Sequence, residues 1–291
     1  MLENHLESIL RFLLLVVFSQ ISSLALACEP EENCTSVNKW QLGVAFGVGV
    51  RTNPLVDGEN IPLVILPDIA WYGESAYFDN GELGYQWIQD PKQALSTFVQ
   101  FDAERAFFSF WHPSNVFMPL RVEGIQDTGV NIGELPDSPG LSINSVASRD
   151  WAVNAGIRWH YYSQSGAWTL SAEQDVSGVH QGGKVNISYQ HHMQWQDWKV
   201  SLVPTLVWKS TQLVNYYYGI DARDNVSELF YYRATAGWQP SLTMSMQKPI
   251  NEKWQWLFRA SYQYLHAGMR HSPLVKQNNI QSAFFGLAYR F

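Results

Sequence analysis

The sequence is poor in charge and in cysteine. Of its 291 residues, 15% are Asp, Glu, Lys or Arg, whereas about a quarter are charged in an ordinary soluble domain. The two cysteines cannot supply the four thiolates of a structural zinc or iron–sulfur centre. The net charge of −7 disfavours wholesale binding to nucleic acid phosphates. We therefore predict no metal, no cofactor and no nucleic acid partner.

Long apolar runs are also missing. After the N-terminus, no stretch approaches the ~20 apolar residues that a membrane-spanning helix needs. Aromatic residues, in contrast, make up 14% of the chain, which excludes a disordered protein. An aromatic-rich, charge-poor chain without membrane helices is typical of a transmembrane β-barrel or a large secreted β protein.

The N-terminus has the pattern of a secretory signal peptide. Arg11 precedes the apolar run Phe12–Phe18, which is too short to span a bilayer. The segment ends in Ala25-Leu26-Ala27, an A-x-A cleavage site. We predict a cleaved signal over residues 1–27; the alternative is a retained membrane anchor.

Cleavage after Ala27 would make Cys28 the first mature residue, and two interpretations of it remain open. Cys28 could be lipidated, although Ala25 stands where lipoprotein signals usually carry a larger aliphatic residue. Alternatively, Cys28 could pair with Cys34 in a disulfide, which an oxidising periplasm permits. We favour the disulfide, within a periplasmic N-terminal segment over residues 28–39.

Alternation of apolar and polar residues dominates the rest of the chain. Between Trp198 and Trp208 every second residue is apolar, and Trp254–Tyr264 shows the same pattern. This period predicts half-buried strands, and several are longer than the ~5–6 residues of soluble strands. Ten residues of strand tilted by about 40° rise ~25 Å, the height of the lipid-facing band of a membrane barrel. We expect Val200 and Phe258 to face lipid, and Ser201 to face the lumen.

The sequence predicts an all-β fold over residues 40–291, a transmembrane antiparallel up-and-down β-barrel of about 10–12 strands. The third to fifth candidate strands are poorly patterned, so ten strands remain an alternative to twelve. Loops are expected at 104–150, 210–225 and 267–281, and small residues on the lumen face at Gly43, Gly47 and Gly49. The candidate strands are 40–50, 61–72, 75–80, 82–89, 95–103, 151–162, 167–176, 182–193, 197–209, 229–245, 254–266 and 282–291.

The last strand carries a further pattern. Phe285, Leu287, Tyr289 and Phe291 share one face, and Phe291 ends the chain. An aromatic last residue on an alternating final strand resembles the signal by which outer-membrane proteins are recognised for assembly. We therefore regard Tyr289 and Phe291 as a C-terminal assembly signal, and the barrel-assembly machinery as a partner.

Several short stretches resemble the MipA/OmpV family of Gram-negative outer-membrane proteins. They are Asp175–Gly182, Tyr217–Ile220, Ser272–Val275 and the ending Gly286–Phe291. Their order along the chain is more specific than any one of them, and residues 90–150 fit least well. The family motif residues are Asp175, Gly178, His180, Gly182, Ser272 and Pro273.

The resemblance implies an integral protein of the Gram-negative outer membrane that contacts outer-membrane lipid. It also implies a scaffold for peptidoglycan-synthesis and remodelling enzymes, namely a lytic transglycosylase and a murein synthase. The family has no accepted catalytic site, so we predict no enzyme and no catalytic residues. The alternatives are a narrow porin-like channel or a surface adhesin, and, with less support, an outer-membrane hydrolase.

Two groups of polar residues are candidate sites. Asp175 and His180 could form a dyad or bind a metal, but no nucleophile accompanies them at a fixed spacing. We favour a turn-capping Asp and a hydrogen-bonded His. Asp102, Glu104 and Arg105 are either lumen charges, which tune selectivity in a pore, or part of a solvated loop, and the sequence leaves both open.

Overall fold

The structure is a computed structural model that describes residues 37–109, 111–117, 120 and 140–291. The predicted signal peptide and the candidate pair Cys28 and Cys34 lie outside the described residues. Both remain predictions. In the described part of the chain, no helix is long and apolar enough to cross a membrane.

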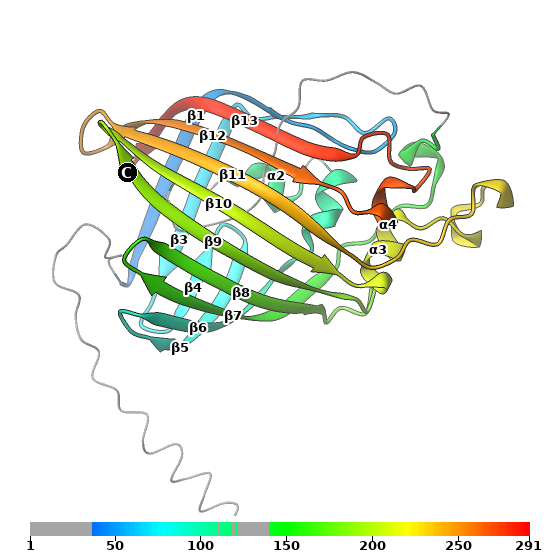
Figure 1. Cartoon of the computed structure of the whole chain (residues 1–291), viewed down its shortest axis with the longest axis horizontal. Helices are drawn as coiled ribbons and strands as arrows, with labels where there is room; N and C mark the ends of the chain where they lie inside the picture. Colours follow the sequence, from blue (N-terminus) through cyan, green and yellow to red (C-terminus); the bar gives the residue numbers. More distant parts are fainter. Residues whose placement is uncertain (1–36, 110, 118–119, 121–139) are drawn as a thin grey trace, which may run out of the picture. The chain divides into compact units, whose positions relative to one another are not determined.

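The chain forms one closed antiparallel sheet, in which consecutive strands are neighbours (Figure 1). Among the described residues the sheet has 13 strands, of which the two-residue β2 (Ile61–Pro62) pairs with β1 in line with β3, so 12 strands form the barrel wall. β13 pairs with β1 and closes the ring. The strands are β1 Lys39–Arg51, β3 Ile65–Tyr72, β4 Ala76–Asp79, β5 Glu82–Gln89, β6 Gln93–Phe101, β7 Val153–Ser163, β8 Gly166–Asp175, β9 Gly183–Trp195, β10 Trp198–Lys209, β11 Gly237–Pro249, β12 Trp254–Tyr264 and β13 Asn279–Arg290.

Each of the twelve predicted segments overlaps one of the twelve barrel strands, and segment 61–72 also contains β2, so the barrel is confirmed. The prediction of a strand from residue 229 was wrong, because β11 begins at Gly237. Residues Glu228–Phe230 form a 3₁₀ turn, η4, in which the Ser227 side chain accepts a hydrogen bond from the Leu229 N–H. They lie beyond the edge of the sheet, where no neighbouring strand holds them in an extended conformation. The predicted loop at 210–225 also contains a helix, α3 (Thr211–Tyr218).

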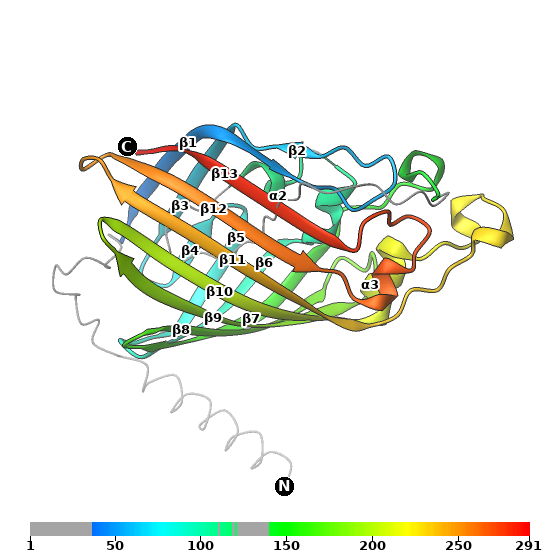
Figure 2. The ribbon, with the colours of Figure 1, turned by 45° about the horizontal axis from the view of Figure 1, so that its top comes forward.

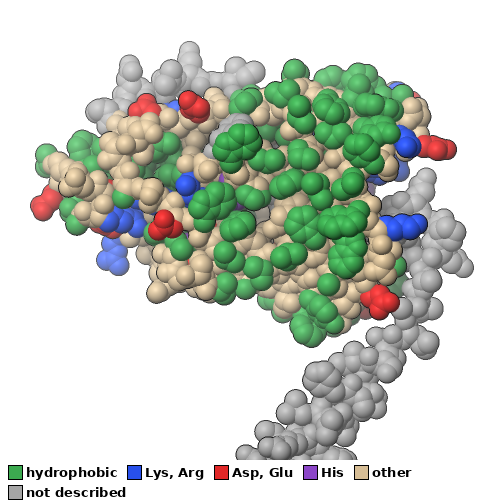
Figure 3. All heavy atoms as spheres, turned by 180° about the vertical axis from the view of Figure 1, so that it is seen from behind, with side chains coloured by type: hydrophobic (Ala, Val, Ile, Leu, Met, Phe, Trp, Pro, Cys, Tyr) green, Lys and Arg blue, Asp and Glu red, His purple; other side chains and the backbone are tan. Residues whose placement is uncertain are grey.

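The two faces of the sheet are inverted relative to a soluble protein. Large apolar side chains such as Leu242 and Phe285 point outward and are about half exposed, at 50% and 46%. Polar side chains such as Asn154, Ser201 and Thr243 point inward and are buried. Figure 3 shows hydrophobic side chains over the barrel wall and most charged side chains toward its two ends. An apolar outer surface of this extent is favourable in lipid and costly in water.

Turns and loops divide between the two ends of the barrel. One end carries tight turns, for example between β7 and β8 and between β9 and β10. The other end carries the long connections, with α3, α4 (Ala267–Arg270) and the 3₁₀ turns η2 (Ile143–Ser145) and η3 (Ala222–Asp224), as Figure 2 shows. Apolar residues of these loops form a small core. Its members include Leu213, Tyr217, Tyr218, Leu265, Met269 and Leu274.

Candidate functional site

The connection between β6 and β7 turns into the lumen immediately after β6. Asp102 is fully buried and begins a 3₁₀ turn, η1 (Ala103–Phe107), by accepting a hydrogen bond from the Glu104 N–H at 2.9 Å. A short helix, α2 (Pro113–Val116), follows. Both views of the ribbon place α2 inside the ring of strands (Figures 1 and 2). The predicted loop at 104–150 therefore starts as an inward-folded segment, and no strand occurs in its described part.

Side chains from the end of β1 hold this segment. Arg51 donates to the Asn115 side-chain oxygen at 2.9 Å, and its guanidinium lies 4.7 Å from the centre of the Phe107 ring. Asn53 donates to the Phe107 carbonyl at 2.7 Å. Asn115 in turn donates to the Ala106 carbonyl at 2.8 Å. Because these donors and acceptors are buried, each unpaired group would cost free energy, and the network specifies one position for the segment.

Leu120 lies farther along the lumen. Its carbonyl accepts hydrogen bonds from Gln247 at 2.7 Å and from Arg290 at 3.2 Å. Its side chain is fully buried, and a Cβ at Gly43 would lie 2.8 Å from its Cδ1. This contact explains the expected small residue on the lumen face of β1. The apolar cluster around Leu120 contains Ala45, Ile61, Leu63, Leu66, Leu257, Phe284 and Ala288.

Glu104 is the centre of a buried charge network at the mouth of the barrel. The Lys209 ammonium lies 2.5 Å from one carboxylate oxygen, and the Tyr218 hydroxyl donates to the other at 2.6 Å. Burial alone would raise the pKa of Glu104, but the neighbouring Lys209 charge outweighs it and holds the pKa below its usual value. The pair joins the inward-folded segment to β10 and to α3.

Asp102 forms the second half of the network. It accepts a hydrogen bond from Asn154 at 2.6 Å, and the Lys184 ammonium lies 3.6 Å away. Burial opposes ionisation of Asp102, but Lys184 and the hydrogen bonds hold its pKa below the usual value. Lys184 also pairs with Glu173 at 3.1 Å. Asp102 and Glu104 are therefore enclosed lumen charges, which decides between the two interpretations that the sequence left open.

A separate ion pair lies on the lumen side of the barrel wall, between β5 and β7. The Arg158 guanidinium binds both oxygens of Glu82, at 2.6 and 2.7 Å. The Tyr77 hydroxyl donates to the same carboxylate at 2.7 Å, and the Phe98 ring lies 4.1 Å from the guanidinium carbon. Such bidentate pairs are the strongest of the charged contacts. The lumen is thus lined by paired charges of both signs.

Asp175 and His180 belong to the turn between β8 and β9. The Asp175 carboxylate accepts hydrogen bonds from the N–H groups of Ser177, His180 and Gln181, at 2.7–2.8 Å. The His180 Nδ1 accepts from the Gly182 N–H at 2.9 Å. This is the turn-capping arrangement that the sequence favoured. Among the described residues, no group of three or more His, Cys, Asp or Glu side chains could hold a metal ion.

The family motif residues from separate loops meet around α3. The His180 and Tyr217 rings lie 5.8 Å apart, and a side chain at Gly182 would collide with the backbone N–H of Leu213. Ser272 donates to the Tyr218 carbonyl at 2.6 Å. The motif therefore holds together the loops at one end of the barrel. Gly178, with φ of +79°, forms the tip of its turn, and Pro273 accepts from the Leu141 N–H at 2.8 Å.

The C-terminal aromatic residues lie at the end with the tight turns. The Tyr289 and Phe291 rings pack edge to face at 5.0 Å, and Tyr289 also contacts Trp254 at 4.8 Å. Phe291 is 75% exposed. An exposed aromatic end is accessible to another molecule, and its role in assembly remains a prediction.

Sequence reasoning did not single out the partners of the buried acids. Lys184 and Lys209 are charged residues on the polar face of alternating strands. This position is the sequence feature that could have identified them as lumen residues. Lys209 and Glu104 are 105 residues apart. Their pairing depends on how far the β6–β7 connection folds inward, and no local sequence pattern predicts that distance.

The family described as MltA-interacting protein MipA matches residues 42–291. The outer membrane protein YiaT of Escherichia coli strain K12 is 24% identical over 254 residues, which cover 86% of this chain and 91% of YiaT. The outer membrane protein OmpV of Vibrio cholerae is 25% identical over 166 residues, covering 56% of this chain and 63% of OmpV. Among solved structures, the NanC porin aligns with 86% of this chain and 100% of its own, at 9% identity and a TM-score of 0.42. The family match covers nearly the whole barrel.

Proposed function

The chain belongs to the MltA-interacting protein MipA family of outer-membrane barrels, and from this premise we propose that it anchors cell-wall enzymes and is not an open pore. Its relatives are outer membrane proteins. In such barrels the short turns face the periplasm and the long loops face outward. The proposal assigns no catalytic activity to the chain.

The inward-folded segment carries the proposal. A barrel of 12 strands has a narrow interior, and here the lumen also contains η1, α2 and Leu120. Buried ion pairs fix the segment at the mouth, and the Leu120 carbonyl is bound by Gln247 and Arg290 of the last strands. Opening a pore would break several buried polar contacts at once. A barrel of this kind is better suited to holding a partner than to conducting solutes.

The partner would be a periplasmic enzyme. The family description names MltA, a lytic transglycosylase, and the proposal includes a murein synthase recruited to the same complex. The periplasmic turns are short and offer little surface. The predicted N-terminal segment 28–39 leads into β1 at this end of the barrel, so we propose that it makes the main contact.

Affinity capture tests the proposal. The tagged protein is purified from gently solubilised outer membranes, beside a variant without residues 29–36 and a control without residues 227–231 of the outer loop. We expect wild type and control to retain a transglycosylase in stoichiometric amount, and the N-terminal deletion to lose it. Recovery of wild-type barrel without any cell-wall enzyme would contradict the proposal.

A narrow channel is the second candidate, because the lumen is lined by charged side chains. The pairs Lys184–Glu173 and Arg158–Glu82 would attract ions of either sign into an aqueous path. Conductance in planar bilayers separates the two functions. A closed wild-type barrel is expected for the anchor, whereas steady ion current through wild-type protein would favour the channel.

A further inference from the structure

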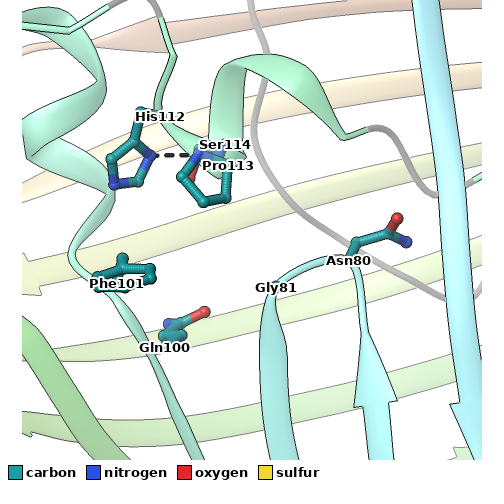
Figure 4. Close-up of a pocket in the computed structure, with 7 residues that line it drawn as sticks. All are labelled: Asn80, Gly81, Gln100, Phe101, His112, Pro113 and Ser114. Carbon is teal, nitrogen blue, oxygen red and sulfur yellow. Dashed lines mark hydrogen bonds between the residues drawn. The ribbon is translucent and has the colours of Figure 1, made fainter.

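Three histidines, His112, His180 and His266, form the same hydrogen-bonded cap in three different connections of the long-loop end. In each, Nδ1 accepts a hydrogen bond from the backbone N–H two residues farther along the chain, at 3.2, 2.9 and 3.1 Å respectively. Figure 4 shows this bond between His112 and Ser114 at the start of α2. The three residues, here called the cap histidines, lie between β6 and β7, between β8 and β9, and between β12 and β13.

The cap requires a neutral imidazole ring. A ring nitrogen that accepts a hydrogen bond carries no proton, so the neutral ring carries its proton on Nε2. The Nε2 atoms of all three cap histidines are buried and, in the part of the chain that the structure describes, have no hydrogen-bond partner. A second proton would bind Nδ1, where it would face the backbone N–H. Protonation of the ring and capping of the backbone therefore exclude each other.

The three rings are enclosed by their neighbours. His112, His180 and His266 are 0%, 6% and 7% exposed. The His112 ring stacks on Trp151 at 4.9 Å, and a side chain at Gly237 would collide with the His266 ring. A protonated ring that has lost its cap cannot reach water unless the loop around it moves.

Positive charges face two of the rings. Burial lowers the pKa of His266 to about 4; Lys209 and Arg270 act in the same direction, and Glu104 opposes them. Glu104 is already paired with Lys209. A proton on His266 would therefore add a third positive charge around one carboxylate.

His112 has a similar environment. Burial lowers its pKa to about 4, and the charges of Arg51, Arg105 and Lys184 act in the same direction. Asp102 opposes them but is itself paired with Lys184. The charged form of His112 is thus disfavoured by its surroundings as well as by the loss of its cap.

His180 lies between two carboxylates. Its Nε2 is 3.8 Å from Asp102, and its Nδ1 is 3.9 Å from Asp175. Burial lowers the pKa of His180; Asp102, Asp175 and Glu104 oppose this effect, and Lys184 adds to it. The carboxylates reduce the penalty for a charged ring here, so His180 should respond to acid less strongly than the other two cap histidines.

The capped loops share one apolar core. The His180 ring lies 5.8 Å from the Tyr217 ring of α3. Tyr217 belongs to the same buried cluster as Phe107 of η1 and Met269 of α4. A loop that moves to expose its histidine therefore disturbs the packing of the other loops.

We propose that the cap histidines form an acid-sensitive latch, which keeps the loop end of the barrel closed at neutral pH and releases the loops when the rings are protonated. Protonation removes the backbone caps and adds positive charge beside Lys209, Lys184 and Arg51. The wall keeps its structure, because its strands are held by their own ladder of backbone hydrogen bonds. The proposal does not depend on the anchor function.

The sign follows from the protons that each state binds. In the opened state a histidine has an ordinary pKa of about 6.5 and gains a proton below that pH, whereas in the closed state it stays neutral. Each unit of pH below about 6.5 therefore favours opening by up to tenfold per histidine. By about pH 4, His112 and His266 each shift the opening equilibrium by on the order of 100-fold.

Oxidation of Met269 by hydrogen peroxide measures the opening. Met269 is fully buried in the loop core, whereas Met193 on β9 is 42% exposed and serves as an internal reference. The full chain in phosphatidylcholine vesicles is treated at pH 7, 5.5 and 4, and mass spectrometry follows the sulfoxide of each residue. We expect the ratio of the Met269 rate to the Met193 rate to rise at least tenfold between pH 7 and pH 4. The electrophoretic mobility of unheated protein should show a folded barrel at each pH.

Replacement by Asn separates protonation from capping. The Asn side-chain oxygen accepts from the same backbone N–H but cannot be protonated. The variant with His112→Asn, His180→Asn and His266→Asn should keep Met269 protected at pH 4. His271→Asn, at an exposed histidine that follows α4, is the control and should respond as wild type does.

The single variant His266→Asn keeps the test decisive if the triple variant does not fold. It should reduce the rise in Met269 oxidation at least fivefold. No rise in wild type, an equal rise in wild type and in the folded Asn variants, or loss of the folded barrel in wild type at pH 4 would overturn the proposal.

Discussion

The Glu104–Lys209 pair makes the closed mouth of the barrel testable by a double-mutant cycle. Both side chains are nearly buried, with 7% and 4% exposed, and the Tyr218 hydroxyl donates to the same carboxylate. Lys209→Met would leave the Glu104 carboxylate buried without its cation. Glu104→Gln would leave the Lys209 ammonium buried without its anion. Removing one partner of a buried pair costs about 3–5 kcal/mol.

The double variant should be more stable than either single variant. Gln and Met are neutral and close in volume to the residues they replace, and the amide oxygen introduced by Glu104→Gln can still accept from the Tyr218 hydroxyl. Replacement of a whole buried pair by neutral groups is often free of cost. We therefore expect a coupling free energy of about 2 kcal/mol or more, where independent sites would add to within about 0.5 kcal/mol.

Reversible urea unfolding in lipid vesicles, followed by tryptophan fluorescence, measures these differences. The exposed pair Lys248–Asp197, 3.0 Å apart with side chains 39% and 75% exposed, is the control. It should contribute about 0–1 kcal/mol. Additive effects at Glu104 and Lys209, or losses no larger than at the control pair, would refute the assignment of a buried network that closes the mouth.

Phe258→Lys on the lipid face should destabilise the barrel by about 2–4 kcal/mol, whereas Ser261→Lys on the lumen face should be tolerated; equal folded fractions by electrophoretic mobility would contradict this. Gly81→Ala should cost about 1–2 kcal/mol, because φ there is +98°, and an unchanged urea midpoint would disagree. Burial lowers the pKa of His112 and His266 to about 4. Only the unfolded state then gains protons between about pH 6.5 and 4, so the free energy of unfolding should fall as the pH drops through this range. Unfolding measured at about pH 7 and pH 5 checks this. The fall should be smaller in a variant that carries both His112→Phe and His266→Phe.

Strand positions were predictable because each strand lies between two different environments. Lipid on one side and a polar lumen on the other make apolar and polar residues alternate with a period of two along each strand. Strands such as Trp198–Lys209 can therefore be recognised from their own sequence. β4 has only four residues, too few to show the period. The extended conformation predicted from residue 229 failed because those residues lie beyond the sheet and cap their own turn instead.

The candidate site was less accessible to local reasoning. Asp102 and Glu104 were recognised as charges, but a lumen position and a solvated loop have the same sequence pattern. Arg158 and Glu82 are 76 residues apart, and both are ordinary polar-face residues of their strands. Asp175 and His180 differ, because their partners lie within the same turn. Contacts within a few residues were predictable, and contacts across the barrel were not.

The sequence by itself determined the class of the protein, the approximate strands and the face that meets lipid, since each depends on alternation or composition that neighbouring residues report. Only the tertiary structure decided that the β6–β7 connection folds into the lumen and that paired charges hold it there. These features depend on which distant residues meet when the sheet closes. The register and length of all twelve strands together determine which distant residues meet, and no single segment of the sequence contains that information.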